Sequence, residues 1–319
     1  MKNPFEYSFD NKRYHTLHYH NKMTFGKKIF KAVIDAGFTC PNKDGKKGRG
    51  GCIFCDGGSG YFTKESAVPV SVQLESELER IKKKTPDASV IAYFQANTNT
   101  YADARTLRKI YLPVIDFKDV VGISIGTRAD CLSEEILDFL EEISEKTYLT
   151  VELGMQSVHE KTIDFIKRGY MHKEFLKGYD ALKKRNIRTC LHIINGLPFE
   201  TYEDMLETAR QTAVLSPDAV KIQLLHVIRG TYLEKLYNEN VFETMTMEDY
   251  IKTVVRQLEY LPPTTVIERI TGDGDKNKLV APMWSTNKIA VLGGIDKMQA
   301  ELNSWQGSRY SDKCPAGNI

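Results

Sequence analysis

The chain has 319 residues, of which 41% are hydrophobic and 27% charged, and its formal net charge is +2. These values are ordinary for a globular protein and give no global basic signal for nucleic acid. No window of 18 apolar residues occurs and the N-terminus lacks an apolar core, so we expect neither a membrane span nor a signal peptide. Six cysteines in a chain of this length indicate free thiols in a reducing cytoplasm rather than a disulfide framework.

Strand and helix patterns alternate along most of the chain. The patterns predict strands over residues 28–35, 88–94, 120–126, 148–155, 187–194 and 218–225. They predict helices over residues 71–84, 102–115, 133–144, 159–167, 172–185 and 201–215, with Ser71, Ser133 and Thr201 as N-caps. This alternation is typical of a parallel α/β fold.

We expect three regions: an N-terminal aromatic and basic strap over 1–26, a partial (β/α)6 TIM-like barrel over 27–262, and a C-terminal extension over 263–319. The aromatic side chains of the strap, which alternate with cations, could stack on nucleic-acid bases or could pack on the barrel.

Four of the predicted strands have one face that is small, polar or charged, with residues such as Ser124, Glu152 and Lys221 on it. Parallel strands covered by helices on both faces are normally apolar on both. We therefore expect an incomplete barrel whose inner face lines a wet ligand cavity. The alternative, a sheet open to solvent on one side, fits less well with a helix after every strand.

Three cysteines lie in one glycine-rich stretch between Gly37 and Gly60, at the spacing C-x11-C-x2-C. Thiolates of Cys40, Cys52 and Cys55 can hold three irons of a [4Fe-4S] cluster and leave the fourth iron open. Zinc is the alternative, because C-x2-C is also a zinc-binding pattern and a histidine could supply the fourth ligand; the candidates are His15, His18 and His20. Cys131, Cys190 and Cys314 are expected to be ordinary free cysteines.

The segment Cys52-Ile53-Phe54-Cys55 resembles the C-x-Φ-C signature of radical S-adenosylmethionine (radical SAM) enzymes, in which Φ is aromatic. Most of that family has three residues between the first two cysteines, and the eleven found here resemble the branch of the elongator catalytic subunit and the YtqA/YhcC group. The resemblance covers about residues 15–275. It implies a [4Fe-4S] cluster on the three cysteines, S-adenosyl-L-methionine as cofactor with Phe54 beside its adenine, and an electron donor of the flavodoxin or ferredoxin type.

Further motifs of that branch follow the predicted strands. Residues 95–100, QANTNT, resemble F-Q-x-x-T-N-T, and residues 126–130, GTRAD, resemble G-T-R-P-D. Residues 152–157, ELGMQS, resemble E-L-G-x-Q-S, with an arginine twelve residues later, and G-L-P at 196–198 follows strand 187–194. By resemblance, the methionine amino group is received by Gln95, Asn97 and Thr98, the ribose or a hydroxyl by Gln156 and Glu152, and the methionine carboxylate by Arg168. Arg128 is expected to meet a carboxylate or phosphate, and His192 is either a ligand contact or a core residue.

Six residues on or after the last strands are candidates for the substrate side: Lys221, Gln223, His226, Arg229, Glu268 and Arg269. Lys and Arg crowd into 27–50 and 161–188, which favours a polyanion unless these are solvated helix faces. Relatives of the elongator type act on the wobble uridine of tRNA, so the resemblance implies a reaction on the C5 side chain of a modified wobble uridine. The alternatives are a radical SAM enzyme for a peptide or small metabolite, and a non-enzymatic zinc-binding RNA module.

Overall fold

The structure, a computed structural model, describes residues 3–56, 66–95, 97–272 and 274–311. Within these residues, seven strands form one sheet in the order β1-β2-β3-β4-β5-β6-β8. Their bounds are Ile29–Ile34 (β1), Ser89–Phe94 (β2), Val120–Thr127 (β3), Tyr148–Gln156 (β4), Thr189–Asn195 (β5), Ala219–Leu224 (β6) and Val266–Arg269 (β8). The pairs β1/β2, β2/β3, β3/β4 and β6/β8 are parallel.

The predicted α/β fold of the partial-barrel type is confirmed, because the strand order follows the chain and the edge strands β1 and β8 end the series. All six predicted strands are present within one or two residues of their expected bounds. The sheet also contains a seventh strand, β8, which lies after the six predicted units. A short antiparallel pair, β7 (Val227–Ile228) and β9 (Leu279–Ala281), is separate from this sheet.

The chain forms two compact units. The cysteine-loop unit comprises residues 21–154 and 167–190, and the C-terminal unit comprises residues 1–20, 155–166 and 191–319. The predicted boundaries at residues 26 and 262 stay predictions.

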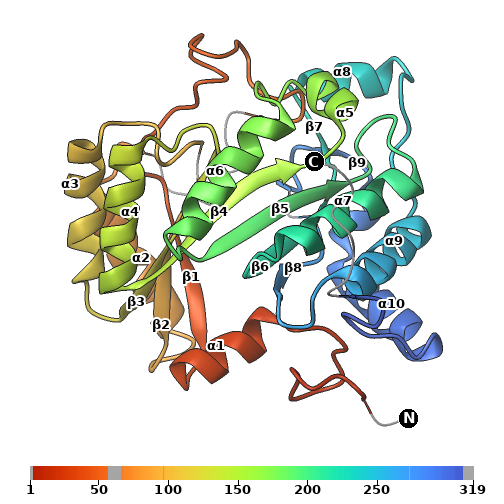
Figure 1. Ribbon diagram of the computed structural model, residues 1–319, viewed down its shortest axis with the longest axis horizontal. Helices are drawn as coiled ribbons and strands as arrows, with labels where there is room; N and C mark the ends of the chain where they lie inside the picture. Colours follow the sequence, from red (N-terminus) through yellow and green to blue (C-terminus); the bar gives the residue numbers. More distant parts are fainter. Residues whose placement is uncertain (1–2, 57–65, 96, 273, 312–319) are drawn as a thin grey trace. The chain divides into compact units, whose positions relative to one another are not determined.

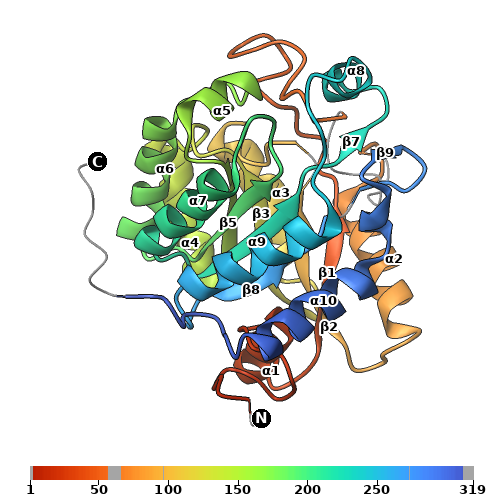
Figure 2. The ribbon, with the colours of Figure 1, turned by 90° about the vertical axis from the view of Figure 1, so that its right-hand side faces the viewer.

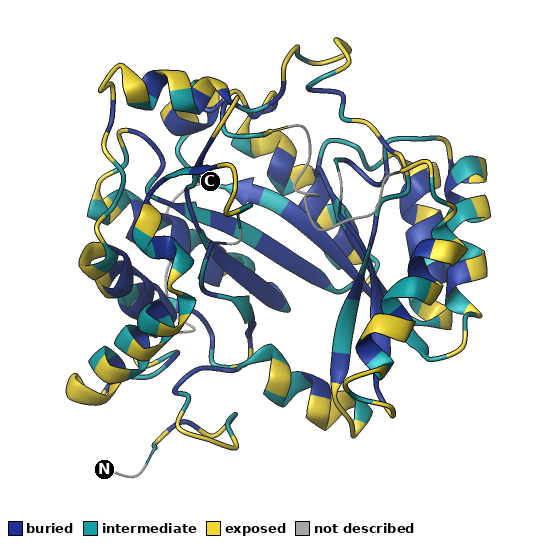
Figure 3. Ribbon diagram, turned by 180° about the vertical axis from the view of Figure 1, so that it is seen from behind, coloured by how far each residue is buried: buried dark blue, intermediate teal, exposed yellow. Residues whose placement is uncertain are grey.

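In the cysteine-loop unit, helices cover one face of β1–β4 (Figure 1). These helices are α2 (Val70–Lys82), α3 (Ala104–Ile115), α4 (Glu134–Lys146) and α6 (His172–Lys184). Their apolar stripes are buried, for example Leu74 in α2, Leu107 in α3 and Phe139 in α4, all at 0% exposure. Figure 3 shows buried strands and helices whose outer surfaces are exposed.

Side-chain capping explains some of the helix starts but not all of them. Thr201 caps α7 (Tyr202–Leu215) as predicted, because its side chain accepts a hydrogen bond from the Asp204 N–H. Ser133 stands at the N-cap of α4, but its side chain makes no capping bond. The prediction for Ser71 is wrong, because α2 begins at Val70 after Pro69; proline fits a helix start, where N–H groups have no partner anyway.

The C-terminal unit is built from helices that follow β4, β5, β6 and β8. Helix α9 packs against α7 and α10 (Figure 2). The bounds are Glu160–Phe165 (α5), Tyr232–Asn238 (α8), Met247–Tyr260 (α9), Met283–Thr286 (η1, a 3-10 helix) and Lys288–Glu301 (α10). None of the described helices has the length and apolar character needed to cross a membrane.

The N-terminal segment leads into α1 (Leu17–Phe25), a helix that the sequence analysis did not predict. Before it, the Tyr7 ring stacks on the His15 ring at 5.0 Å between centroids. The His15 backbone is tied to the C-terminal unit, since its N–H donates to Gln306 and its carbonyl accepts from Ile267. The strap therefore packs against the rest of the protein at His15, which is the second of the two alternatives stated for it.

Candidate functional site

The loop that follows β1 carries the three cysteines, and its backbone folds into a closed hairpin. The Pro41 carbonyl accepts from the N–H groups of Lys47 and Gly48, and the Asn42 carbonyl accepts from Gly51 N–H at 2.9 Å. Gly51 has φ +80°, a conformation that favours glycine. The eleven residues between the first two cysteines are therefore a side loop whose neck lies at Asn42 and Gly51, so that the chain returns to Cys40 before reaching Cys52.

The cysteine side chains are half-buried, and all three thiols are free. Cys52 and Cys55 flank a tight turn in which Cys55 N–H donates to the Cys52 carbonyl at 2.9 Å, and Phe54 is half-buried in that turn. Burial and the neighbouring Cys55 raise the pKa of the Cys52 thiol to about 11. Binding of iron would displace that proton, because the thiolate is the metal ligand.

The chemistry of the donor set tests which metal group fits. Besides burial, the charges of Cys55 and Cys40 raise the pKa of the Cys52 thiol, so the three thiols lie near one another. Three thiolates on one loop would suit three irons of a [4Fe-4S] cluster and would leave its fourth iron for another ligand. The donor set therefore fits a [4Fe-4S] cluster, with Cys40, Cys52 and Cys55 as the residues that would hold it.

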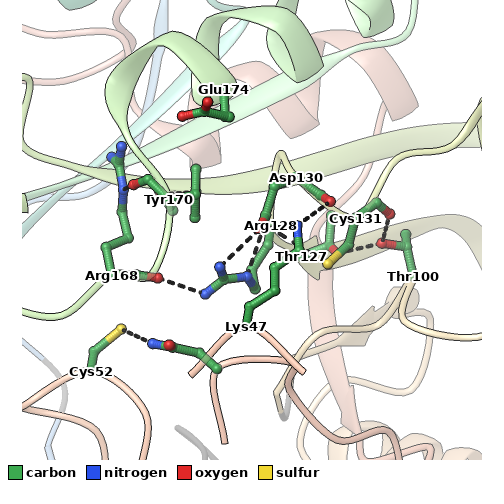
Figure 4. Close-up of polar contacts among 12 residues, drawn as sticks. Lys47, Cys52, Thr100, Thr127, Arg128, Asp130, Cys131, Arg168, Tyr170 and Glu174 are labelled. Atoms are coloured by element: carbon green, nitrogen blue, oxygen red, sulfur yellow. Dashed lines mark hydrogen bonds and ion pairs between the residues drawn. The ribbon is translucent and has the colours of Figure 1, made fainter. Parts of the chain in front are cut away.

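Arg128, just after β3, meets a carboxylate in the fork geometry expected for it, and that carboxylate belongs to Asp130 (Figure 4). Arg128 Nε donates to Asp130 Oδ1 at 2.9 Å and Nη2 to Oδ2 at 3.0 Å. Its third nitrogen, Nη1, donates to the Arg168 carbonyl at 2.8 Å. Burial lowers the pKa of the Arg128 guanidinium, but the hydrogen bonds and charge of Asp130 outweigh burial and raise it above its ordinary value. Arg128 thus ties two loops of the unit together.

Arg168 is buried, with 1% of its surface exposed. Its guanidinium carbon lies 4.3 Å from the centroid of the Tyr170 ring, and its Nε donates to the Tyr170 carbonyl at 3.1 Å. Burial raises the pKa of Tyr170 to about 12, so the ring stays neutral beside the cation. The stacked guanidinium is fixed in orientation, as binding of a small carboxylate requires.

The segment after β2 contacts the cysteine loop. Lys43 Nζ donates to Asn97 Oδ1 at 2.9 Å, and Asn97 Nδ2 donates to the Phe38 carbonyl at 2.9 Å. Thr98 N–H donates to the Thr39 carbonyl. Asn97 therefore uses its side-chain amide within the protein, whereas Gln95 and Thr98 are buried residues beside it.

Glu152 on β4 is the centre of a polar network on the inner face of β1–β4. Lys31 Nζ donates to Glu152 Oε1 at 2.7 Å, Ser124 Oγ donates to the same oxygen at 2.6 Å, and the Tyr93 hydroxyl donates to Oε2 at 3.0 Å. Glu152 is 1% exposed. The polar side chains predicted on one face of β3 and β4 do meet here, as Ser124 and Glu152, and β1 and β2 add Lys31 and Tyr93, for which no polar face was predicted.

The remaining predicted residues lie in the C-terminal unit. Gln156 ends β4 in a left-handed conformation, φ +59°, and its Oε1 is buried without a hydrogen-bond partner among the described residues. Buried polar atoms are normally satisfied, so this oxygen is available as an acceptor for a ligand. His192 Nδ1 lies 3.3 Å from Gln223 Nε2.

Four of the six substrate-side candidates lie on the neighbouring strands β6 and β8: Lys221 and Gln223 on β6, and Glu268 and Arg269 on β8. Lys221 Nζ on β6 lies 3.7 Å from Glu268 Oε2 on β8, and both side chains are about 5% exposed or less. Arg269 is the register partner of Lys221. His226 is packed against Gly272 and Gly274, where a Cβ atom would lie 2.3 and 2.6 Å from its ring, and Arg229 is exposed.

Sequence reasoning missed four residues that organise this site: Asp130, Asn42, Lys31 and Tyr93. Asp130 belongs to the G-T-R-A-D motif, and its spacing from Arg128 was the available signal for an ion pair. Lys31 is a charged residue inside an apolar strand, which indicates a buried partner. Asn42 and Tyr93 carried no comparable signal.

Similarity to known proteins bears on this site at the level of the family and of the fold. Residues 45–212 match the radical SAM superfamily, and residues 217–301 match the radical SAM C-terminal domain. The protein YtqA of Bacillus subtilis is 46% identical over 311 residues, covering 97% of each chain. The tRNA uridine(34) acetyltransferase of Methanocaldococcus jannaschii is 25% identical over 156 residues, covering 48% of this chain and 28% of that protein. The structure of Elp3 from Methanocaldococcus infernus superimposes with a TM-score of 0.65 at 17% identity, covering 87% of this chain and 64% of that one, which supports the fold.

Proposed function

Because the chain belongs to the radical SAM superfamily, we propose that it modifies tRNA, at the C5 side chain of an already modified wobble uridine. The superfamily uses a [4Fe-4S] cluster and S-adenosyl-L-methionine. When bound, these cofactors supply the electron and the 5′-deoxyadenosyl radical that removes hydrogen from a substrate carbon. A flavodoxin or ferredoxin is the proposed electron donor, and a tRNA substrate places the reaction in the cytoplasm.

The chain's own residues would bind and orient the cofactor. Cys40, Cys52 and Cys55 would hold the cluster. Arg168, fixed by its stack on Tyr170, would pair with the methionine carboxylate of S-adenosyl-L-methionine. Gln156 Oε1 would accept a ribose hydroxyl, which would satisfy an oxygen that has no partner among the described residues. Glu152 holds the inner wall in place through its three hydrogen-bond donors.

One observation carries the choice of tRNA: the side loop between the metal-binding cysteines presents exposed cations. Lys46 and Arg49 are exposed, and Lys46 Nζ lies 5.0 Å from the centroid of the Tyr101 ring. Cations beside an aromatic ring suit a phosphate backbone and a base. The relative that acts on tRNA uridine 34 by its name supports the same substrate class.

The contacts of the loop decide which variant tests this proposal. Lys47, a third cation of the loop, donates to Asp130 at 2.6 Å, so its removal would disturb the Arg128 network. The informative variant is therefore Lys46→Ala with Arg49→Ala. Its matched control is Lys83→Ala with Lys84→Ala, which removes the same charge from exposed residues that directly follow α2.

The assay is a filter-binding titration of tRNA across salt concentration. The slope of log K against log salt becomes shallower by about 0.7 to 0.9 for each phosphate that the protein no longer neutralises. We expect the loop variant to show a shallower slope than wild type and the control pair to match wild type, while cleavage of S-adenosyl-L-methionine without substrate is unchanged in both. Mass spectrometry of tRNA nucleosides from cells with and without the gene then identifies the modified uridine. If the wild-type protein does not bind tRNA even at low salt, the tRNA proposal is wrong, and a peptide or small metabolite becomes the proposed substrate.

A further inference from the structure

Asn42 lies in the neck of the cysteine loop, and its side-chain amide contacts a metal-binding cysteine. Asn42 Nδ2 lies 3.6 Å from Cys52 Sγ, within hydrogen-bond range for sulfur, and also donates to the Lys167 carbonyl at 2.7 Å. The residue is 4% exposed. Each of the two amide hydrogens thus has an acceptor.

Two glycines leave the space that this amide occupies. A Cβ atom added to Gly48 would lie 2.2 Å from Asn42 Oδ1, and one added to Gly169 would lie 2.5 Å from the same oxygen. Gly169 also has φ +83° and directly follows Arg168. The amide is therefore enclosed between the cysteine loop and the segment that carries Arg168, and it has little freedom to turn away from the sulfur.

We propose that Asn42 is a positioning residue that donates a hydrogen bond to the Cys52 sulfur of the bound cluster and thereby raises the reduction potential of that cluster. The same amide holds residues 167–169 against the loop. The proposal concerns the cluster alone, so it holds whichever substrate the enzyme acts on.

The direction of the effect follows from charge. Reduction adds negative charge to the cluster and to its cysteine sulfurs, and a hydrogen-bond donor stabilises the more negative state. Loss of the donor should therefore make the cluster harder to reduce.

The test is an anaerobic redox titration of the reconstituted, substrate-free protein, followed by electron paramagnetic resonance. At a fixed ambient potential, we expect Asn42→Ala to lower the ratio of reduced to oxidised cluster by several-fold and up to about tenfold, and tenfold corresponds to about 59 mV for one electron. Gly48→Ala keeps the asparagine but pushes its amide, so its shift should have the same sign. Gly48 itself has no left-handed φ that would strain an alanine.

Gln73→Ala is the matched control. Gln73 is a fully buried amide of the same unit whose Nε2 donates to the carbonyls of Asp35 and Val68, both at 2.7 Å, and it ties loop backbone without a sulfur contact. Its variant should keep the wild-type potential. The proposal is overturned if Asn42→Ala or Gly48→Ala retains its iron with an unmoved potential, or if Gln73→Ala moves the potential equally. Loss of the cluster from both loop variants would also overturn it, because the amide would then serve folding of the loop alone.

Discussion

Replacement of Asp130 by asparagine removes the charge that holds Arg128 while nearly preserving shape. The Asp130 side chain is 4% exposed and that of Arg128 11%, so the pair lies largely out of water. Neutralising one partner of a buried pair typically costs about 3 to 5 kcal/mol, because the other charge remains buried. Asparagine keeps one acceptor oxygen, so we expect a loss of about 3 kcal/mol, at the lower end of this range. Lys47, with 42% of its side chain exposed, adds little.

The loss should depend on pH in a defined direction. Burial alone would raise the pKa of Asp130, but the hydrogen bonds and charges of Arg128 and Lys47 outweigh it, and the pKa is lowered. A lowered pKa contributes stability that is fully present above the ordinary value of about 4 and is lost as the pH falls through the folded value. The difference between wild type and Asp130→Asn should therefore be constant above about pH 5 and shrink below about pH 4.

The assay is urea unfolding of the cluster-free protein at several pH values, with Asp138→Asn as the control. Asp138 also pairs with an arginine, Arg185 at 3.0 Å, but its side chain is 68% exposed. The control should unfold like wild type at every pH. The reasoning is refuted if Asp130→Asn is as stable as wild type at neutral pH, or if its deficit persists unchanged below about pH 4. We also expect this variant to bind S-adenosyl-L-methionine more weakly, because Arg128 would no longer fix the Arg168 carbonyl.

Two further outcomes are expected. Alanine at Cys40, Cys52 or Cys55 should abolish iron binding, whereas alanine at Cys131, Cys190 or Cys314 should leave the iron content unchanged; Cys314 lies outside the described residues. Arg168→Ala should keep the cluster and weaken S-adenosyl-L-methionine binding by about 1.5 to 3 kcal/mol, or roughly ten- to a hundredfold, measured by anaerobic equilibrium dialysis. Iron loss on replacing Cys131 or Cys190, or an unchanged affinity in Arg168→Ala, would contradict these assignments.

The sequence predicts the strands of the cysteine-loop unit well, because each is a short apolar run bounded by turn residues and followed by an amphipathic helix. The strand β8 was harder to predict, since it has only four residues and two of them are charged. The polar inner face was predictable from side-chain alternation, and Ser124 and Glu152 do meet there.

The motifs showed few of the partners within the site. The spacing of Arg128 and Asp130 inside one motif was a signal for their ion pair, whereas nothing in the sequence pointed to the contact between Asn97 and Lys43. The ligand contacts expected for these residues stay predictions. A motif indicates which positions carry polar groups at the end of a strand. It does not tell which of these groups satisfy one another, because that depends on backbone hydrogen bonds between segments far apart in the chain.

Those mutual contacts have a consequence for cofactor binding. Four segments follow the strands of the cysteine-loop unit, and each is bonded to others by side chains: Asn42 to Lys167, Lys43 to Asn97, Lys47 to Asp130, Arg128 to Arg168, and Thr100 to Thr127 and Cys131. These links belong to the folded chain itself, so the ordering of the linked residues need not be driven by the binding of S-adenosyl-L-methionine. Substitutions that loosen the links should therefore weaken binding even at residues that do not touch the cofactor.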